Sequence, residues 1–359
     1  MRFNNKTLYN SIKKILVIGP SWVGDIIMSH SLYRTLKVQY PDASIDVMAP
    51  HSCCSLLKRM PEINQVITMP LGHGVLNISQ RYRLGKMLRN NYYDHAYVLP
   101  NSFKSALIPF FASIPCRIGW KGEMRYGLLT NVYTKINKNI LPLMVERYVA
   151  LAYPLQEIKT TKKLSQPLLW PILSVSNKEI TETITKFNLT YNRYCIGLCP
   201  GAEFGPAKRW PHYHYATLAQ KLIEEGYHIF FFGSDKDKTI ANNIYYLLKK
   251  NRNNCSNLIG KTTLDQVTIL IAACRAIVTN DSGLMHIAAA LNKPLVALYG
   301  PSSPNFTPPL SNTAKIIRLS TGYLKIRKGN AEYNYDYSLT NIKPDVVLQE
   351  LKLLLKREI

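Results

Sequence analysis

Acidic residues and long apolar runs are both scarce in this sequence. It holds 22 Asp and Glu against 45 Lys and Arg in 359 residues, a formal net charge of +23. No stretch approaches the ~18 consecutive apolar residues that a membrane-spanning helix needs. The basic N-terminus, MRFNNKTLYNSIKK, lacks the apolar middle of a signal peptide. We therefore expect a cytoplasmic protein without a membrane span.

The basic excess narrows the choice of partners without deciding it. Such a charge attracts nucleic acid, an anionic membrane surface or a phosphorylated substrate. The chain is also rich in Asn, Lys, Ile and Tyr, a usage that an AT-biased genome produces without selection for charge. Long basic runs and an aromatic RNA-binding signature are missing, so we expect no nucleic-acid partner. A polyanion-binding protein without enzymatic activity remains an alternative, and steep salt dependence would identify it.

Cysteine motifs are missing as well. The seven cysteines are scattered along the chain, and none belongs to a C-x-x-C pair. This spacing argues against a disulfide framework and against a zinc site. We expect free thiols in a reducing compartment.

The chain repeats one design half a chain apart. KKILVIGPSWVGD (residues 13–25) and RYCIGLCPGAEFG (residues 193–205) both read as a strand followed by a Gly-containing loop. Further apolar runs, separated by helical patterns, read as buried parallel strands: residues 44–50, 95–100, 228–233, 276–281 and 294–300. We predict an α/β chain with two doubly wound, Rossmann-like domains, 1–170 and 171–342. An amphipathic C-terminal helix, 343–359, is expected to cross back to the first domain.

Neither of the common nucleotide motifs is complete in the first Gly-containing loop. Gly19 and Gly24 have the spacing of a P-loop, but Asp25 stands where the phosphate-binding lysine should be. The tripeptide G-P-S at this loop does not supply the G-x-G-x-x-G of an NAD-dependent dehydrogenase. Asp25 either caps its helix, because an acid complements the helix dipole, or takes part in chemistry.

The second Gly-containing loop, CPGAEFGPAKRWP (residues 199–211), suits an anion. Backbone amides freed by Gly201 and Gly205 could cradle a negative group, and Lys208 adds a positive charge nearby. The alternative is a surface turn with an ordinary solvated lysine.

A third set of polar residues follows a buried strand in VTNDSGLMHIAAALNKP (residues 278–294). Ser282 and Gly283 open a helix there, and a helix N-terminus favours phosphate because of its free N–H groups and its dipole. Asp281 or Ser282 could instead only cap this helix, and His286 could be a satisfied core histidine.

The acidic motif in FFGSDKD (residues 231–237) has two interpretations. An Asp-x-Asp motif could hold a metal in a nucleotide-sugar enzyme. Asp235, however, follows the second strand of the second domain, where an acid commonly binds ribose hydroxyls in dinucleotide folds. We favour ribose over metal.

Together these sets resemble the ADP-heptose–lipopolysaccharide heptosyltransferases of Gram-negative bacteria, and most closely the members that add the second heptose. The matching stretches extend from Lys14 to about Gly329 and are ILVIGPSWVGD, DVMAP, MPLGHG, YVLPNSFKSAL, GEMRYGLL, LMVERY, CPGAEFGPAKRWPHYHYA and TNDSGLMHIAAALNKPLVALYGPSSP. The resemblance implies a glycosyltransferase of the B-type fold, with two Rossmann-like domains facing a cleft. It implies ADP-L-glycero-D-manno-heptose as donor and the first heptose of the lipopolysaccharide inner core as acceptor, with inversion at the anomeric carbon.

The resemblance also assigns roles to residues. Asp25 is the expected general base, and Lys208 is expected to face the donor diphosphate. The expected donor-binding set is Gly201, Glu203, Lys208, Trp210, Asp235, Asp281, Ser282, Gly283 and His286. The expected acceptor-binding set is Trp22, Gly24, Asn101, Lys104, Arg125 and Arg147.

The expected partners follow from the same resemblance. They are ADP-heptose and a lipid A–Kdo–heptose acceptor, which a monomer meets at the cytoplasmic face of the inner membrane through peripheral contact. We expect no metal and no cofactor. Transfer to a different core position, that of the first or third heptose, remains an alternative.

Overall fold

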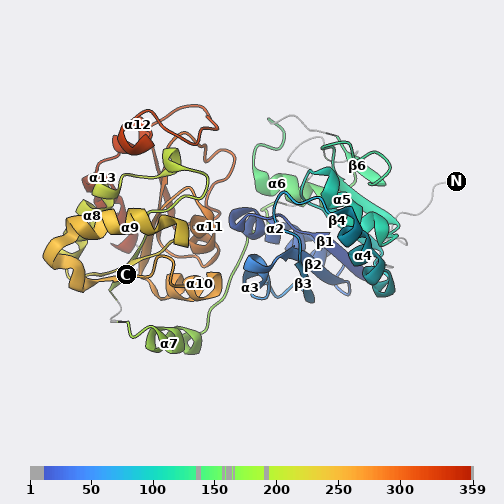
Figure 1. Ribbon diagram of the computed structural model, residues 1–359, viewed down its shortest axis with the longest axis horizontal. Helices are drawn as coiled ribbons and strands as arrows, with labels where there is room; N and C mark the ends of the chain where they lie inside the picture. Colours follow the sequence, from blue (N-terminus) through green and yellow to red (C-terminus); the bar gives the residue numbers. More distant parts are fainter. Residues whose placement is uncertain are drawn as a thin grey trace. The chain divides into compact units, whose positions relative to one another are not determined.

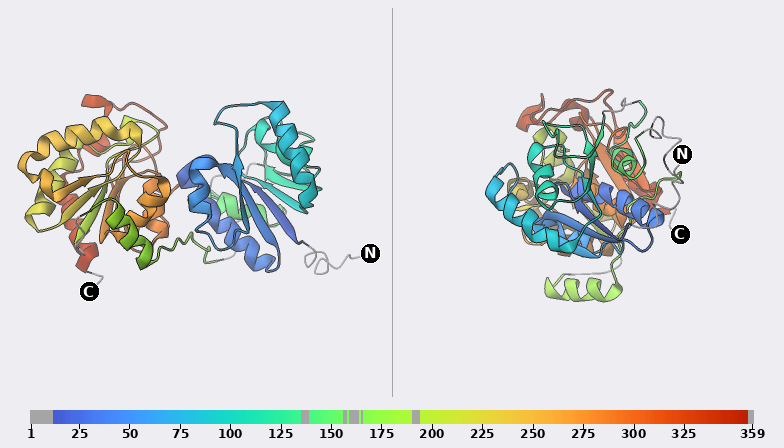
Figure 2. Two further views of the ribbon diagram at one scale, coloured as in Figure 1. Left: turned by 60° about the horizontal axis from the view of Figure 1, so that its bottom comes forward. Right: turned by 90° about the vertical axis from the view of Figure 1, so that its right-hand side faces the viewer.

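The computed structural model describes residues 12–134, 139–155, 158, 164, 166–189 and 194–356. The chain divides into two compact units, Met1–Pro171 and Ile172–Ile359, so the division lies one residue beyond the predicted boundary. Within each unit, parallel strands lie side by side among helices (Figures 1 and 2). The predicted α/β fold class with two Rossmann-like domains is confirmed.

The first unit is built on a six-stranded parallel sheet of order β3-β2-β1-β4-β5-β6. Its strands are β1 (Lys14–Ile18), β2 (Ser44–Pro50), β3 (Gln65–Met69), β4 (His95–Val98), β5 (Cys116–Trp120) and β6 (Asn131–Tyr133). Its helices are α2 (Val23–Gln39), α3 (Cys54–Leu57), α4 (Ile78–Leu88), α5 (Phe103–Phe111) and α6 (Met144–Val149).

The strand order of the first unit reverses at β1. Ile15 pairs with Ile45 of β2 on one side and with His95 of β4 on the other. The chain therefore leaves β1 and β4 in opposite directions, and a crevice opens at the carboxyl ends of these two strands. The loop that leads to Asp25 and α2 starts at this crevice.

The second unit repeats the design with the order β12-β11-β10-β7-β8-β9, again parallel throughout. Its strands are β7 (Cys195–Cys199), β8 (His228–Phe231), β9 (Cys255–Asn257), β10 (Ala276–Asn280), β11 (Leu295–Tyr299) and β12 (Ala314–Arg318). Its helices are α7 (Asn177–Lys186), α8 (His212–Glu224), α9 (Lys238–Leu248), α10 (Leu264–Ala273), α11 (Gly283–Ala290), α12 (Tyr337–Thr340) and α13 (Pro344–Lys356). Here the order reverses between β7 and β10.

The C-terminal helix α13 belongs to the core of the second unit. Val347, Leu351 and Leu354 lie along one face, with the i, i+4, i+7 spacing of an amphipathic helix. This face is buried against α8 and β11. The apolar face of α13 thus packs within the second unit, and the expected crossing of this helix to the first domain stays a prediction.

Two further features follow the composition. All seven cysteines are free thiols. Within the described ranges, none of the helices combines the length and the apolar character that crossing a bilayer requires.

Candidate functional site

Asp25 lies in the first turn of α2, directly after the loop that leaves β1. The N-cap residue of this helix is Trp22, whose side chain makes no cap hydrogen bond. The Asp25 carboxylate accepts a hydrogen bond from the Tyr148 hydroxyl at 3.0 Å. Burial raises the pKa of Asp25, and the hydrogen bond from Tyr148 opposes this rise in part. Asp25 is therefore a desolvated, oriented carboxylate, which is more than a helix cap requires.

Tyr148 is a site residue that sequence reasoning missed. It lies on α6, which packs against α2, and its side chain is buried. Burial and the neighbouring Asp25 carboxylate raise the pKa of Tyr148 well above its ordinary value, so the hydroxyl stays protonated and remains a donor. Tyr148 ends the stretch LMVERY, but a separation of 123 residues gives no sign that it reaches Asp25.

A cavity of about 610 Å³ lies in the first unit at the carboxyl ends of its central strands. Asn101 and Lys104, two of the predicted acceptor residues, line it, together with Gly19 and Ser21 from the loop after β1. Its wall also includes His73, whose ring centroid lies 5.5 Å from that of the exposed Trp22. The structure thus brings the loop that leads to Asp25 and part of the predicted acceptor set to one cavity.

The two arginines that were predicted to bind the acceptor, Arg125 and Arg147, donate hydrogen bonds to backbone carbonyls. The buried Arg125 donates to the Pro100 carbonyl at 2.7 Å and also to the Trp120 carbonyl. Burial lowers the pKa of Arg125 to about 10, so it stays charged at neutral pH. Arg147 donates from Nε to the Leu141 carbonyl at 3.1 Å. These contacts order the loops around the crevice, and an acceptor role for either arginine stays a prediction.

In the second unit, Lys208 and Asp281 form the centre of the predicted donor site. Their side chains pair, with Nζ 2.5 Å from Oδ2. Lys208 ends the short 3₁₀ turn η6 (Pro206–Lys208), while Asp281 follows β10 directly and precedes the N-terminus of α11. A lysine ammonium and a helix N-terminus therefore lie together where an anion would be stabilised.

His286 lies on α11, one turn after the helix start, and is buried. Burial and, to a smaller extent, the Lys208 charge lower the pKa of His286 to about 4, although Asp281 opposes this shift. His286 is therefore neutral at pH 7. It can accept or donate a hydrogen bond but carries no charge that would neutralise an anion.

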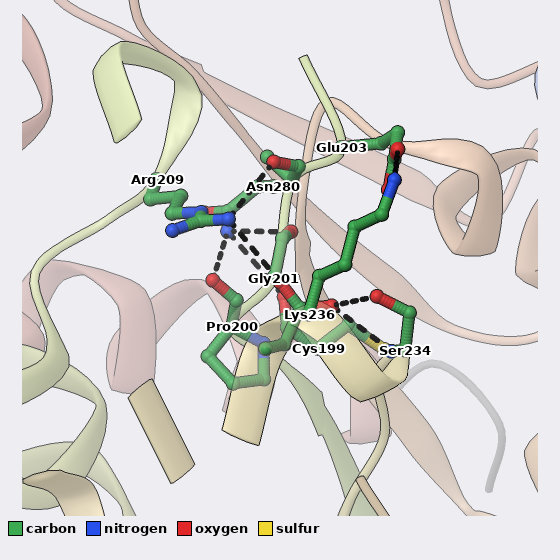
Figure 3. Close-up of polar contacts among 10 residues, drawn as sticks. Cys199, Pro200, Gly201, Glu203, Arg209, Ser234, Lys236 and Asn280 are labelled. Atoms are coloured by element: carbon green, nitrogen blue, oxygen red, sulfur yellow. Dashed lines mark hydrogen bonds and ion pairs between the residues drawn. The ribbon is translucent and has the colours of Figure 1, made fainter. Parts of the chain in front are cut away.

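Asn280 connects the strand that precedes this site to the loop after β7 (Figure 3). Its Oδ1 accepts from the Trp210 amide at 2.9 Å, and its Nδ2 donates to the carbonyls of Pro200 at 2.9 Å and Gly201 at 3.1 Å. The side chain is fully buried. Sequence reasoning missed this role, although a buried asparagine at the carboxyl end of a strand is the available signal.

Trp210 does not have the role that the sequence predicted. Its side chain is fully buried, and its indole N–H donates to the Ile342 carbonyl at 2.9 Å. The ring packs on Tyr215, with centroids 4.8 Å apart. Trp210 is a core residue that anchors the loop after Lys208, so its indole is not available to a donor.

The two acids of the Asp-x-Asp motif, Asp235 and Asp237, lie in different surroundings. Asp235 and Glu203 are largely exposed and pair with Lys238 and Lys236, respectively. Asp237 is buried and accepts from the Ser234 amide at 2.9 Å (Ser234 and Lys236 are drawn in Figure 3). Among the described residues, no three His, Cys, Asp or Glu side chains gather where they could hold a metal ion.

The position of Asp237 also explains why residue 201 is a glycine. A Cβ at Gly201 would collide with the Asp237 carboxylate, so only glycine fits the loop at that point. Arg209 donates to the same carboxylate at 3.3 Å. The structure thus uses Asp237 to shape the donor loop, while ribose binding by Asp235 stays a prediction.

Arg327 is a further residue that sequence reasoning missed. Two cations lie near the Phe204 ring, with Lys208 Nζ 5.5 Å and Arg327 Cζ 5.6 Å from its centroid. The Arg327 carbonyl accepts from the Ala207 amide at 3.1 Å. The loop that carries Lys208 is therefore supported by a segment far along the chain, which local sequence patterns do not reveal.

Comparison with known proteins identifies the relatives of this chain. The family model described as glycosyltransferase family 9 (heptosyltransferase) matches residues 81–335. The chain is 63% identical to lipopolysaccharide heptosyltransferase 2 of Escherichia coli K12, over 96% of this chain and 99% of that protein. It is 59% identical to lipooligosaccharide heptosyltransferase 2 of Haemophilus ducreyi, over 95% and 99%. The solved structure of E. coli ADP-heptose LPS heptosyltransferase II matches with a TM-score of 0.89 at 59% identity, covering 96% and 99% of the two chains.

Proposed function

The chain belongs to glycosyltransferase family 9, the heptosyltransferases, and from this premise we propose its reaction. It transfers L-glycero-D-manno-heptose from ADP-heptose to the first heptose of the inner core, a step of lipopolysaccharide core biosynthesis. The observation that carries this proposal is the nearly full-length similarity to heptosyltransferase 2 proteins. The site geometry supports it, because one unit offers an anion site and the other a cavity with an oriented carboxylate nearby.

The donor diphosphate binds at Lys208 and the N-terminus of α11. Lys208 is paired with Asp281, which holds the ammonium beside the N-terminus of α11, where the diphosphate is proposed to bind. As the bond between the anomeric carbon and the diphosphate oxygen breaks, negative charge grows on the departing ADP. Preorganised donors at such a position are worth roughly 3–4 kcal/mol each.

Asp25 removes the proton from the acceptor hydroxyl while that oxygen attacks the anomeric carbon. The new carbon–oxygen bond forms on the face opposite to the leaving diphosphate, so the configuration inverts. Burial raises the pKa of Asp25, which makes the carboxylate a stronger base than a solvated aspartate. A positioned base of this kind typically contributes about 10²- to 10⁴-fold to the rate.

The acceptor is lipid A–Kdo–heptose, whose lipid part anchors it in the inner leaflet. We place the enzyme at the cytoplasmic face of the inner membrane, as a monomer in peripheral contact with the bilayer. Transfer needs no metal or cofactor, because Lys208 and the α11 N-terminus neutralise the diphosphate. Activity that disappears with EDTA and returns with Mg²⁺ would contradict this.

The test is a transfer assay with ADP-heptose and core acceptors that end before the first heptose, after it, or after the second heptose. Wild type should use only the acceptor that ends after the first heptose, and Asp25→Asn should lose transfer by about 10²-fold or more while still binding ADP. Use of the shorter acceptor would favour addition of the first heptose, and use of only a longer acceptor would favour the third. Full activity of Asp25→Asn would remove Asp25 as the base.

A further inference from the structure

Helix α4 exposes apolar side chains where a helix on a soluble surface usually exposes polar ones. Ile78, Tyr82 and Met87 are 51%, 43% and 70% exposed, respectively. The buried side of the helix consists of Arg81, Gly85 and Leu88, and Gly85 lies directly on Phe111 of α5. The outward apolar residues are therefore not needed for the core of this unit.

The exposed half of the helix is also strongly basic. Arg83, Lys86 and Arg89 are exposed among these apolar residues. Residues 63–122 contain seven Lys and Arg but a single acid, Asp94, and the Asp94 carboxylate accepts from the Lys13 and Lys14 amides at 2.8 and 2.9 Å. No carboxylate on α4 or α5 therefore neutralises the cations.

Aromatic and basic side chains alternate across the junction of α4 and α5, which lie side by side (Figure 1). Lys86 Nζ lies 5.8 Å from the Tyr82 ring centroid, and Tyr82 packs on Phe111 at 5.3 Å. Arg117 Cζ lies 5.6 Å from the ring centroid of the exposed Phe110. A shallow hollow of about 420 Å³ along α4 places Arg83 beside Leu84 and Met87.

We propose that this α4–α5 surface, consisting of Ile78, Tyr82, Arg83, Lys86, Met87, Arg89 and Phe110, docks on a bilayer that carries anionic lipid headgroups. The combination of outward apolar side chains with flanking cations is that of a helix lying in a membrane interface. The hollow, whose lining also includes Asn77, Ser79 and Gln80, offers a cation and polar side chains to a headgroup phosphate beside Leu84 and Met87. A second copy of the chain fits less well, because a two-fold contact would place like charges opposite each other.

The position of the surface fits the proposed function, on which this inference rests. Leu76 and Arg81 line the cavity of the first unit, and α4 begins at Ile78, between them. An enzyme docked through α4 therefore holds the mouth of the acceptor cavity close to the headgroups. This places the cavity where the sugar of a lipid-anchored acceptor emerges from the bilayer.

The test compares binding to vesicles of phosphatidylcholine with and without phosphatidylglycerol. Arg83→Glu/Lys86→Glu should weaken binding to the mixed vesicles at least about 30-fold, since each cation near an anionic surface contributes roughly fivefold. The matched control Lys178→Glu/Lys186→Glu, on the exposed face of α7, changes the net charge equally and should bind nearly as wild type. Ile78→Ser/Met87→Ser should weaken binding about tenfold through the lost apolar contact.

Transfer assays separate this inference from the proposed function. Arg83→Glu/Lys86→Glu should keep wild-type kcat/KM on a lipid-free core oligosaccharide and lose it only on acceptor embedded in vesicles. Absence of transfer in wild type, with vesicle binding still dependent on α4, would refute the proposed function and support the surface. The proposed docking surface would be wrong if the α7 control lost as much vesicle binding as Arg83→Glu/Lys86→Glu. It would also be wrong if wild type did not bind vesicles. A dimer that dissociates in Arg83→Glu/Lys86→Glu would overturn it too.

Discussion

Replacing Tyr148 by Phe removes the hydroxyl that donates to Asp25 and leaves the ring in place. Tyr148 and Asp25 are joined by a hydrogen bond of 3.0 Å, and a hydrogen bond to a charged group is worth about 1.5–3 kcal/mol. At 1.36 kcal/mol for each pKa unit, its loss should raise the pKa of Asp25 by about 1–2 units. The direction follows because this hydrogen bond favours the ionised carboxylate and opposes the effect of burial.

The assay is heptose transfer measured as kcat/KM across the acidic pH range. Because Asp25 acts as a base only when ionised, the acidic limb of the Tyr148→Phe profile should lie about 1–2 pH units above that of wild type. At pH values below this limb, the kcat/KM of Tyr148→Phe should be about 10- to 100-fold lower than that of wild type. At pH values above the limb, it should be close to the wild-type value. Tyr148 itself stays protonated throughout, because its own pKa is raised well above the ordinary value.

The matched control is Tyr33→Phe. The Tyr33 hydroxyl lies in the same core and bonds to Ser29 at 2.8 Å, so its removal disturbs packing without touching Asp25. The acidic limb of this variant should not move. An unmoved limb in Tyr148→Phe, or a loss of rate that is equal at every pH, would refute the role given to this hydrogen bond.

Other variants test the rest of the site. Burial raises the folded-state pKa of Asp25, so wild type loses stability relative to Asp25→Asn as the pH rises. Thermal melts should show that the variant is more stable than wild type at pH 7 and that this difference is gone below about pH 4. Asn280→Ala leaves the buried Trp210 amide without its partner, so denaturant titration should show a loss of about 1–3 kcal/mol for each orphaned group, with a raised donor KM. Lys208→Ala should lower kcat by about 10²- to 10³-fold, and unchanged donor binding and turnover would reject the phosphate assignment.

Much of the architecture could be read from local patterns. Short apolar runs that end in Gly, Pro or Asp became the buried strands β1, β2, β4, β7, β8, β10 and β11, because only a sheet covered on both faces buries such runs. Asp25, Lys208 and Asp281 could be singled out for the same reason, since polar residues at the carboxyl ends of parallel strands meet at one edge. The pairing of Lys208 with Asp281 bears this out.

Three features of the site could not be predicted from the sequence, and the reason is the same for each. The resemblance assigns Trp210 to the donor-binding set, yet its ring is fully buried. Asp235 is expected to bind ribose, which stays a prediction, and the motif gives no sign that its second acid, Asp237, is buried and shapes the loop. No pattern around Tyr148 predicts that its side chain reaches Asp25. In each case the choice depends on which way a side chain points, and the sequence pattern around a loop does not contain that direction.

The amino-acid sequence alone determined the strands, the two-unit division and the family, because hydrophobic periodicity and long motif blocks are local properties that the chain carries wherever it folds. The tertiary structure decided how those residues become a site: that a tyrosine on α6 orients the carboxylate on α2, and that Asn280 and Arg327 support the loop with Lys208. It also turned the apolar, basic face of α4 outward. These facts depend on contacts between segments far apart in the chain. Such contacts form only when the whole chain buries its apolar surface and pairs its buried polar groups at the same time.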